Sequence, residues 1–242
     1  MSGRVVIVTN VLHYAGPAAV AKLAAEGARV VCHDASFASP KALAEWTLAH
    51  PGVLATPAQT PADVVAAALA AHGRVDALVS NDEFPAIRAP LEQAKLEDLR
   101  TGLEAMVVRP FAYAQAAAGP MKKQGGGRLL LITSAAPLRG LSNYSMYATA
   151  RGAANALMLS LSKELAPHNI TVNAVAPNYM NNPTYFPPSL TSNAEAMAKM
   201  LKNIPLGRLG RPEELGALIS FFCLGECEFV TGHVIPIAGG WA

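Results

Sequence analysis

Three side chains in this sequence of 242 residues have the types and the spacing that acid–base chemistry needs. Ser134, Tyr147 and Arg151 form the pattern Ser-x12-Tyr-x3-Arg, and the last two lie four residues apart in a helical pattern, so they share one helix face. A permanently charged guanidinium stabilises a neighbouring phenolate and so lowers the pKa of the phenol. We therefore predict that Tyr147 is a general base, that Arg151 lowers its pKa, and that Ser134 binds the substrate oxygen.

A phenol with an ordinary pKa of ~10 must become ~3 units more acidic to act as a base near neutral pH, which corresponds to ~4 kcal/mol. Arg151 is expected to supply part of this change in the pKa. The alternative is a buried tyrosine that is hydrogen-bonded for packing alone. Tyr144 lacks a cation four residues later, where the chain has Ala148, so it is not the expected base. Ser142 is expected to cap a helix rather than to react.

Short runs rich in β-branched residues alternate with amphipathic, alanine-rich segments along the whole chain. Because the runs are continuously apolar, they indicate strands that are covered on both faces. The expected strands are 4–9, 28–33, 53–56, 75–80, 128–133, 171–176 and 233–237, and the main expected helices are 18–26, 62–72, 96–121, 144–165 and 212–224. This order predicts a single Rossmann-like α/β domain over residues 1–242, with a doubly wound parallel sheet of about seven strands.

The composition of the chain limits its partners. With 52% hydrophobic and 15% charged residues it can bury a full core, and its net charge of +2 is dispersed without a basic stripe for nucleic acid. Cys32, Cys223 and Cys227 lack the histidine spacing of a metal site and are expected to be buried thiols. No apolar run reaches the ~18 residues of a membrane helix. We expect a cytoplasmic protein that binds a small molecule, with no metal, nucleic-acid or membrane partner.

The turn after the first strand carries a resemblance to a known superfamily. Thr9 is followed by Asn-Val-Leu-His-Tyr-Ala-Gly and then by a helix. This segment resembles the short-chain dehydrogenase/reductases, whose members have Thr-Gly-x3-Gly-x-Gly at the same turn. Asn10 and Tyr14 stand at the first two glycine positions, and only Gly16 remains. Glycine lets the pyrophosphate of a nicotinamide cofactor approach the backbone, so a ring at position 14 is expected to block that cofactor.

Other positions that hold the cofactor in this superfamily are also altered. A lysine that would bind the cofactor's ribose is replaced by Arg151. The Asn-Asn-Ala-Gly segment after the fourth strand is replaced by Ser-Asn-Asp-Glu at 80–83, a helical asparagine by Met106, and the glycine of a Pro-Gly pair by Asn178. Asp34 has the spacing of an acid that binds an NAD ribose, but it also fits a helix cap, which we favour.

These features together resemble the halohydrin dehalogenases, a branch of the same superfamily that works without a cofactor and has a Ser, Tyr, Arg triad. The resemblance covers nearly the whole chain, and Tyr14 and Arg151 are features that separate this family from its redox relatives. It implies that Tyr147 removes the hydroxyl proton of a vicinal halohydrin while Ser134 holds the oxygen. The alkoxide then displaces the halide and closes an epoxide. The reverse reaction opens epoxides with anions such as azide, cyanide or nitrite.

The resemblance also implies where the departing halide binds. In the family, this site is built from a Pro-Asn-Tyr-x segment and the aromatic residue of the first turn, here Pro177, Asn178, Tyr179, Met180 and Tyr14. Successive backbone N–H groups of the segment could form an anion nest, although Pro177 and Asn178 could also make an ordinary turn. The apolar residues expected around the organic part of the substrate are Phe84, Pro85, Leu138, Leu141, Tyr185 and Phe186.

Two other functions stay open. An NAD(P)-dependent short-chain alcohol dehydrogenase with divergent motifs is supported by Asp34 and by the Ser and Tyr pair, but Tyr14, Arg151 and Asn178 together oppose it. A sensor or scaffold without catalysis leaves the triad without a purpose. Small residues at 148–154 and 112–119 would let helices approach closely, as at the subunit interface of the superfamily, and this predicts a homotetramer built from two dimers.

Overall fold

The computed structural model describes residues 3–183 and 185–242, and its centre is a parallel sheet of seven strands in the order β3-β2-β1-β4-β5-β6-β7. The strands are β1 Val5–Val8, β2 Arg29–His33, β3 Leu54–Thr56, β4 Ala77–Ser80, β5 Gly127–Ile132, β6 Ile170–Pro177 and β7 Val234–Ile237. The predicted doubly wound parallel sheet is confirmed.

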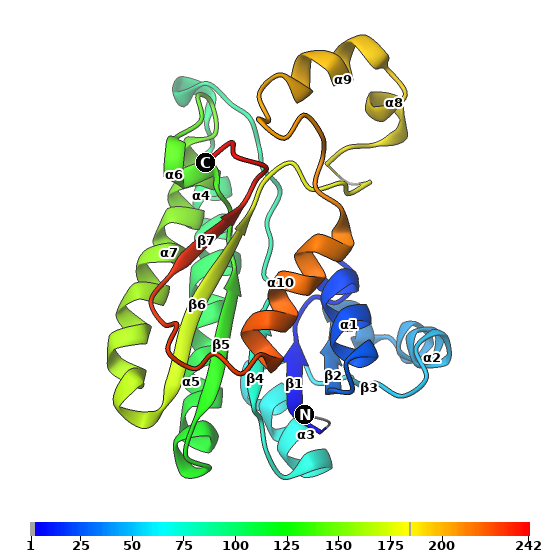
Figure 1. Cartoon of the computed structure of the whole chain (residues 1–242), viewed down its shortest axis with the longest axis vertical. Helices are drawn as coiled ribbons and strands as arrows, with labels where there is room; N and C mark the ends of the chain where they lie inside the picture. The colour runs from blue at the N-terminus through cyan, green and yellow to red at the C-terminus, as the bar shows by residue number, and fades with distance from the viewer. Residues whose placement is uncertain (1–2, 184) are drawn as a thin grey trace.

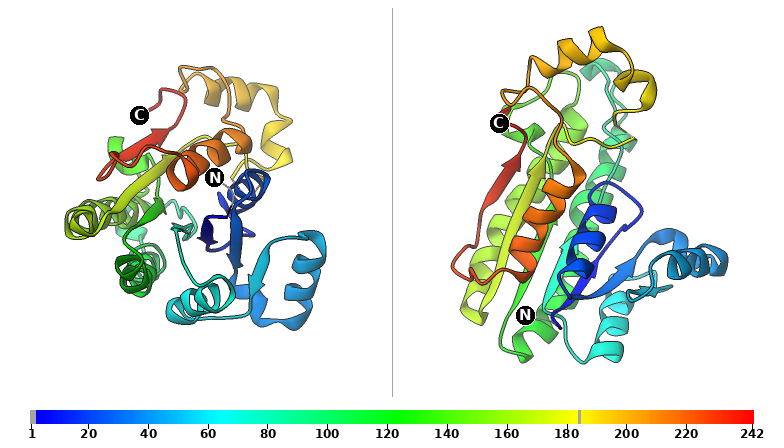
Figure 2. Two further views of the ribbon diagram at one scale, coloured as in Figure 1. Left: turned by 60° about the horizontal axis from the view of Figure 1, so that its bottom comes forward. Right: turned by 45° about the vertical axis from the view of Figure 1, so that its right-hand side comes forward.

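Helices cover both faces of the sheet (Figure 1; Figure 2, left). Alternate side chains of a strand point to opposite faces, so Val6 and Val8 pack under α1 and α10, while Val5 and Ile7 pack against α3 and the α5–α7 side. The helices are α1 Gly16–Ala25, α2 Pro40–Ala49, α3 Pro61–His72, α4 Leu96–Leu103, α5 Arg109–Lys123, α6 Ala136–Arg139, α7 Ser145–Leu165, α8 Pro188–Thr191, α9 Ala194–Leu201 and α10 Pro212–Leu224. Short 3-10 turns are η1 Ala35–Ala38, η2 Leu91–Gln93 and η4 Ala166–His168.

The long helix expected at 96–121 is divided into three parts. Helices α4 and α5 are joined by a π-helical turn, η3, at Glu104–Val108. Pro110 follows this turn, and proline has no N–H group for a regular helical hydrogen bond, so the wider turn forms just before it. The helices α2, α6, α8 and α9 lie outside the set that the sequence predicted.

The strand order reverses between β1 and β4, and the loops that follow β1, β4, β5 and β6 meet at the carboxyl edge of the sheet. Figure 1 shows α8 and α9 above this edge, at the end of the molecule opposite the N-terminus. Cys32 and Cys223 are buried as expected, but Cys227 is exposed because it lies in the surface loop between α10 and β7. Over the described residues, every helix is too short or too polar to cross a membrane.

Gly16 begins α1 at a point where the chain leaves no room for a side chain. A Cβ on Gly16 would lie 2.6 Å from the Asn10 carbonyl oxygen and 2.6 Å from Val11 Cα. Asn10 and Tyr14 have φ angles of 47° and 48°, a left-handed backbone that costs a residue with a side chain roughly 1–2 kcal/mol. The turn therefore keeps the shape of a glycine turn although only Gly16 remains.

Replacing Gly16 by alanine should lower the free energy of unfolding by about 2 kcal/mol, because the new Cβ overlaps backbone atoms that cannot move aside. Urea unfolding measures the loss. Gly152→Ala in α7 is the control, since its Cβ would meet only Pro137 Cβ at an ordinary 3.5 Å. That variant should be as stable as the wild type or slightly more so. Equal losses in both variants would contradict the account of the turn.

Candidate active site

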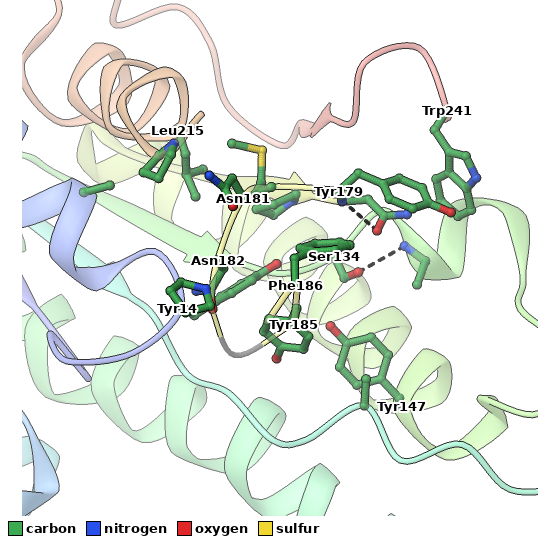
Figure 3. Close-up of a pocket in the computed structure, with 18 of the residues that line it drawn as sticks. Tyr14, Ser134, Tyr147, Tyr179, Asn181, Asn182, Tyr185, Phe186, Leu215 and Trp241 are labelled. Atoms are coloured by element: carbon green, nitrogen blue, oxygen red, sulfur yellow. Dashed lines mark hydrogen bonds between the residues drawn. The ribbon is translucent and has the colours of Figure 1, made fainter. Parts of the chain in front are cut away.

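Ser134, Tyr147 and Arg151 come together at the carboxyl edge of the sheet, and all three are buried. Ser134 lies two residues beyond β5, and its Oγ accepts a hydrogen bond from the Ala136 N–H at 3.1 Å, which leaves the hydroxyl proton free to donate. Figure 3 shows the hydroxyl of Tyr147, in the first turn of α7, directed toward the Ser134 side chain. Arg151, one turn later, donates from Nε to the Tyr147 oxygen at 3.3 Å.

The guanidinium of Arg151 is fixed by backbone groups at two strand ends. Its Nη1 donates to the carbonyl oxygens of Ile132 at 2.9 Å and Asp82 at 3.0 Å, and Nη2 has no partner among the described residues. The guanidinium carbon lies 5.4 Å from the centre of the Tyr147 ring and 5.5 Å from that of Tyr14. Burial by itself lowers the pKa of Arg151, but the phenols of Tyr147 and Tyr14 raise it overall. Arg151 therefore stays charged.

Tyr14 occupies the crevice between the first turn and the triad. Its hydroxyl donates to the Thr133 carbonyl at 3.3 Å, and its ring meets the Tyr185 ring edge-on, with the centres 5.9 Å apart. Burial raises the pKa of Tyr14 well above its ordinary value, so this phenol stays neutral. Tyr14 thus lines the cavity and donates a hydrogen bond to the backbone, while Tyr147 is the phenol that faces Ser134.

Asp34 is a cap, which confirms the interpretation favoured from the sequence. Its Oδ1 accepts from the N–H of Ser36 at 3.0 Å and from the Ser36 hydroxyl at 2.7 Å, at the start of η1. Its Oδ2 accepts from the Leu12 N–H at 3.3 Å. Both oxygens that could bind a ribose are engaged within the protein.

Residues 80–83, at the end of β4 and just after it, hold the turn after β1 through hydrogen bonds. The Asn81 side chain donates to the carbonyl oxygens of Asn10 at 3.0 Å and His13 at 2.8 Å. Asp82 is buried, accepts from Asn10 Nδ2 at 3.1 Å and is hydrogen-bonded to Ser80. The residues that replace the expected Asn-Asn-Ala-Gly segment therefore hold the glycine-poor turn in place.

A cavity of about 440 Å³ opens beside the triad (Figure 3). Its wall includes Ser134 and Tyr147, all of the residues predicted for the halide and three of those predicted for the organic part, namely Tyr14, Pro177, Asn178, Tyr179, Met180, Leu141, Tyr185 and Phe186. No charged side chain of the described residues lines it, because Arg151 lies behind the rings of Tyr14 and Tyr147.

Other lining residues lie outside the predicted site residues, among them Ala86, Tyr144, Asn181, Asn182, Leu215 and Trp241. Asn181 and Asn182 directly follow the predicted halide residues, in a loop after β6 where a doubly wound fold is expected to bind its ligands. Trp241 lies near the end of the chain, and Leu215 is on α10; no local pattern connects either of them with the triad.

Three residues predicted for the substrate pocket lie elsewhere. Phe84 and Pro85 line a much smaller cavity with Met106 and Gly102, on another side of Tyr147, because the loop after β4 turns them toward α4 and η3. Leu138 is 47% exposed, because the short helix α6 directs it outward, while Leu141 after that helix lines the main cavity.

The predicted anion nest is largely occupied by the protein itself. The Asn178 N–H donates to the Ile237 carbonyl at 3.1 Å, and the Tyr179 N–H donates to the side-chain oxygen of Asn178 at 2.9 Å. Pro177 has no N–H group. Within the described residues, the N–H group of Met180 is the one donor of this segment that has no partner.

Comparisons with known proteins agree on the superfamily. Residues 15–242 match the family model described as Enoyl-(Acyl carrier protein) reductase, a short-chain dehydrogenase/reductase model. The 3-oxoacyl-(acyl-carrier-protein) reductase of Thermotoga maritima is 31% identical, over 99% of this chain and 98% of the relative. Dehydrogenase/reductase SDR family member 4 of Homo sapiens is 28% identical, over 99% of this chain and 88% of the relative. The chain is therefore a short-chain dehydrogenase/reductase by fold and by sequence.

Two solved structures are more similar. One is described as a dehalogenation enzyme and is 51% identical, with a TM-score of 0.96 and coverage of 100% of this chain and 99% of that chain. The other is a halohydrin dehalogenase bound to ethyl (2S)-oxiran-2-ylacetate; it is 39% identical, with a TM-score of 0.93 and coverage of 98% and 96%. Within the superfamily, the chain belongs to the halohydrin dehalogenase family, which confirms the resemblance found in the sequence.

Asp82 should make the stability of the protein depend on pH. Burial is the main reason that the pKa of Asp82 is raised from 3.8 to about 6, and the hydrogen bond from Ser80 opposes it. The folded state then holds the proton more tightly than the unfolded chain, so this stabilisation is full below pH ~4 and is lost as pH rises through ~6. A shift of this size corresponds to about 3 kcal/mol.

Asp82→Asn cannot ionise but can keep a hydrogen bond to Ser80. Urea unfolding from pH 4 to pH 8 should show wild-type stability falling relative to the variant between pH ~4 and ~6, and a constant difference above that range. Parallel profiles for the two proteins would contradict the protonation behaviour assigned to Asp82.

Proposed function

We propose that this protein is a halohydrin dehalogenase, which converts a vicinal halohydrin into an epoxide and a halide ion without a nicotinamide cofactor. The observation that carries the proposal is the buried Arg151 guanidinium, hydrogen-bonded to the Tyr147 hydroxyl at 3.3 Å beside Ser134. The similarity to two dehalogenase structures at 51% and 39% identity supports the same function.

In the proposed reaction, Ser134 donates a hydrogen bond to the substrate oxygen, and Tyr147 removes the hydroxyl proton. Arg151 stabilises the phenolate form of Tyr147 that accepts this proton. A lone pair of the alkoxide attacks the neighbouring carbon from the side opposite the halogen and closes the three-membered ring. The halogen leaves with the electrons of the broken bond. Each halohydrin thus gives one epoxide, one halide ion and one proton.

The halide is proposed to bind against Tyr14 and the segment Pro177–Met180. This wall is mostly apolar, and the Met180 N–H group in it has no partner within the described part of the chain. The Tyr14 and Tyr147 rings lie between the cavity and the Arg151 cation, so the anion does not reach a fixed positive charge. A site with few donors and no exposed cation binds the product weakly enough to release it.

The proposal includes no nicotinamide cofactor. Tyr14 occupies the crevice at the first turn, and both carboxylate oxygens of Asp34 are engaged within the protein. The alternative is an NAD(P)-dependent alcohol dehydrogenase, which is favoured by the names of curated relatives such as the Thermotoga maritima reductase at 31% identity. It would share Ser134 and Tyr147 but would need Tyr14 to move out of the crevice.

We also propose that the protein works as a cytoplasmic homotetramer built from two dimers. Phe111 on α5 and Leu159 on α7 are 47% and 46% exposed, and a second copy packed on these helices would cover them. The other partners are small: the halohydrin or epoxide, and the halide or another small anion.

Tyr147→Phe should reduce bromide release from a simple vicinal bromoalcohol at least about 100-fold, because a positioned general base contributes on this order or more. Bromide is measured without added cofactor. Tyr144→Phe is the control, since Tyr144 lines the same cavity but has no cation one turn later, and it should keep most of the activity. Equal rates of bromide release by Tyr147→Phe and the wild type, or no release by either protein, would contradict the proposed role of Tyr147 as general base.

Epoxide opening tests the anion site separately. With a simple epoxide and excess azide, the protein should form the azidoalcohol faster than the uncatalysed reaction, and cyanide and nitrite should react likewise. Bromide should inhibit competitively with azide, because both occupy the same site. Formation of azidoalcohol at only the uncatalysed rate would show that the anion site is assigned wrongly.

A further inference from the structure

Two cavities share one wall at the segment Asn178–Met180. The front cavity, of about 440 Å³, contains Ser134 and Tyr147. The back cavity, of about 120 Å³, is lined by Ile204, Leu206, the end of β7 and the ion pair between Arg208 and Glu214. Asn178, Tyr179 and Met180 line both cavities, so these three residues separate them.

The backbone of this wall is fixed. The Gly210 N–H donates to the Tyr179 carbonyl at 2.9 Å, and the Asn181 N–H donates to the Gly210 carbonyl at 2.7 Å. The Tyr179 ring packs edge-on against Trp241, with the ring centres 5.8 Å apart. Movement of the backbone would break these contacts, so a side chain can adapt to different anions at a lower cost in free energy than the backbone can.

The Met180 side chain is the adaptable part of the wall. It is 7% exposed, and its unbranched thioether has several rotatable bonds. The thioether lies directly on Gly210: a Cβ built on Gly210 would come within 2.5 Å of Met180 Sδ and 2.8 Å of Cε. Gly210 lines the back cavity but not the front one, so the absence of a side chain there gives the thioether a place away from the anion.

We infer that Met180 sets the size of the anion that the site accepts, and that Gly210 sets the position of Met180. The inference rests on the proposed function, because it concerns the halide site of that reaction. Among the described residues, Met180 carries the one N–H group of this segment without a partner, so an anion bound to it lies beside the side chain of the same residue. A larger anion fits only while the thioether stays against Gly210, on the side of the back cavity.

Two substitutions should act in opposite directions. Met180→Ala removes the thioether and joins the cavities, so affinity for iodide relative to chloride should rise roughly tenfold, equivalent to about 1.4 kcal/mol. Gly210→Ala displaces the thioether toward the front cavity, so the same ratio should fall. Leu206→Ala is the matched control, since Leu206 lines only the back cavity, and it should leave the ratio unchanged.

Calorimetric titration of the full-length protein with chloride, bromide and iodide measures these ratios, and the unfolding midpoint of each variant checks that it is folded. An unchanged ratio in Met180→Ala overturns the inference, even if Gly210→Ala does not fold. A ratio that rises equally in Leu206→Ala also overturns it, because the effect would then not depend on the wall. A wild-type protein that binds none of the three halides contradicts the proposed function itself, so the two failures can be told apart.

Discussion

The buried guanidinium of Arg151 is the group on which the rest of the site depends. An isolated cation in a protein interior is costly, and this one is stabilised by two backbone carbonyls and by the faces of two phenol rings rather than by a carboxylate contact. The carbonyls belong to Ile132 and Asp82, at the ends of adjacent strands. Since α7 supplies Arg151 itself, the packing of one helix on two parallel strands fixes the position of the charge. The charge thus lies in hydrogen-bond contact with the Tyr147 hydroxyl.

Tyr14 contacts this cation with its ring and fills the crevice in which related enzymes bind a nicotinamide cofactor. The first turn has a left-handed backbone at position 14, which glycine favours, but a tyrosine stands there. The strain is offset by the hydrogen bond to the Thr133 carbonyl and by the ring contacts with Arg151 and Tyr185. The fold that usually presents a phosphate-binding turn therefore presents an aromatic wall, and the space beside Ser134 becomes an apolar cavity with a few neutral donors.

Much of the site could be predicted because its determinants are local. The spacing of Tyr147 and Arg151 fixes a shared helix face, a serine after an apolar strand lies at the sheet edge, and Asp34 precedes a turn that it can cap. The comparison with the dehalogenases agrees with the family that these residues indicated. Residues whose place depends on distant packing were missed: Trp241 and Leu215 reach the cavity from other elements.

The direction of side chains in loops also could not be predicted from the sequence. Phe84 and Leu138 are apolar and close to the triad in the chain, but turn geometry directs one toward η3 and the other toward solvent. The anion nest was expected from consecutive N–H groups, yet the side chain of Asn178 takes the Tyr179 donor, a competition that spacing alone does not reveal. The π-helical turn before Pro110 likewise interrupts the helix expected at 96–121, and helical periodicity alone does not reveal it.

The central claim is that Tyr14 and the Arg151 site have turned a nucleotide crevice into an anion site. Calorimetric titration of the wild-type protein, once with NADH and once with bromide, tests it most directly. The account predicts that bromide binds in the presence and in the absence of NADH, and that NADH itself gives no binding isotherm. Micromolar binding of NADH, with no binding of bromide, would contradict it.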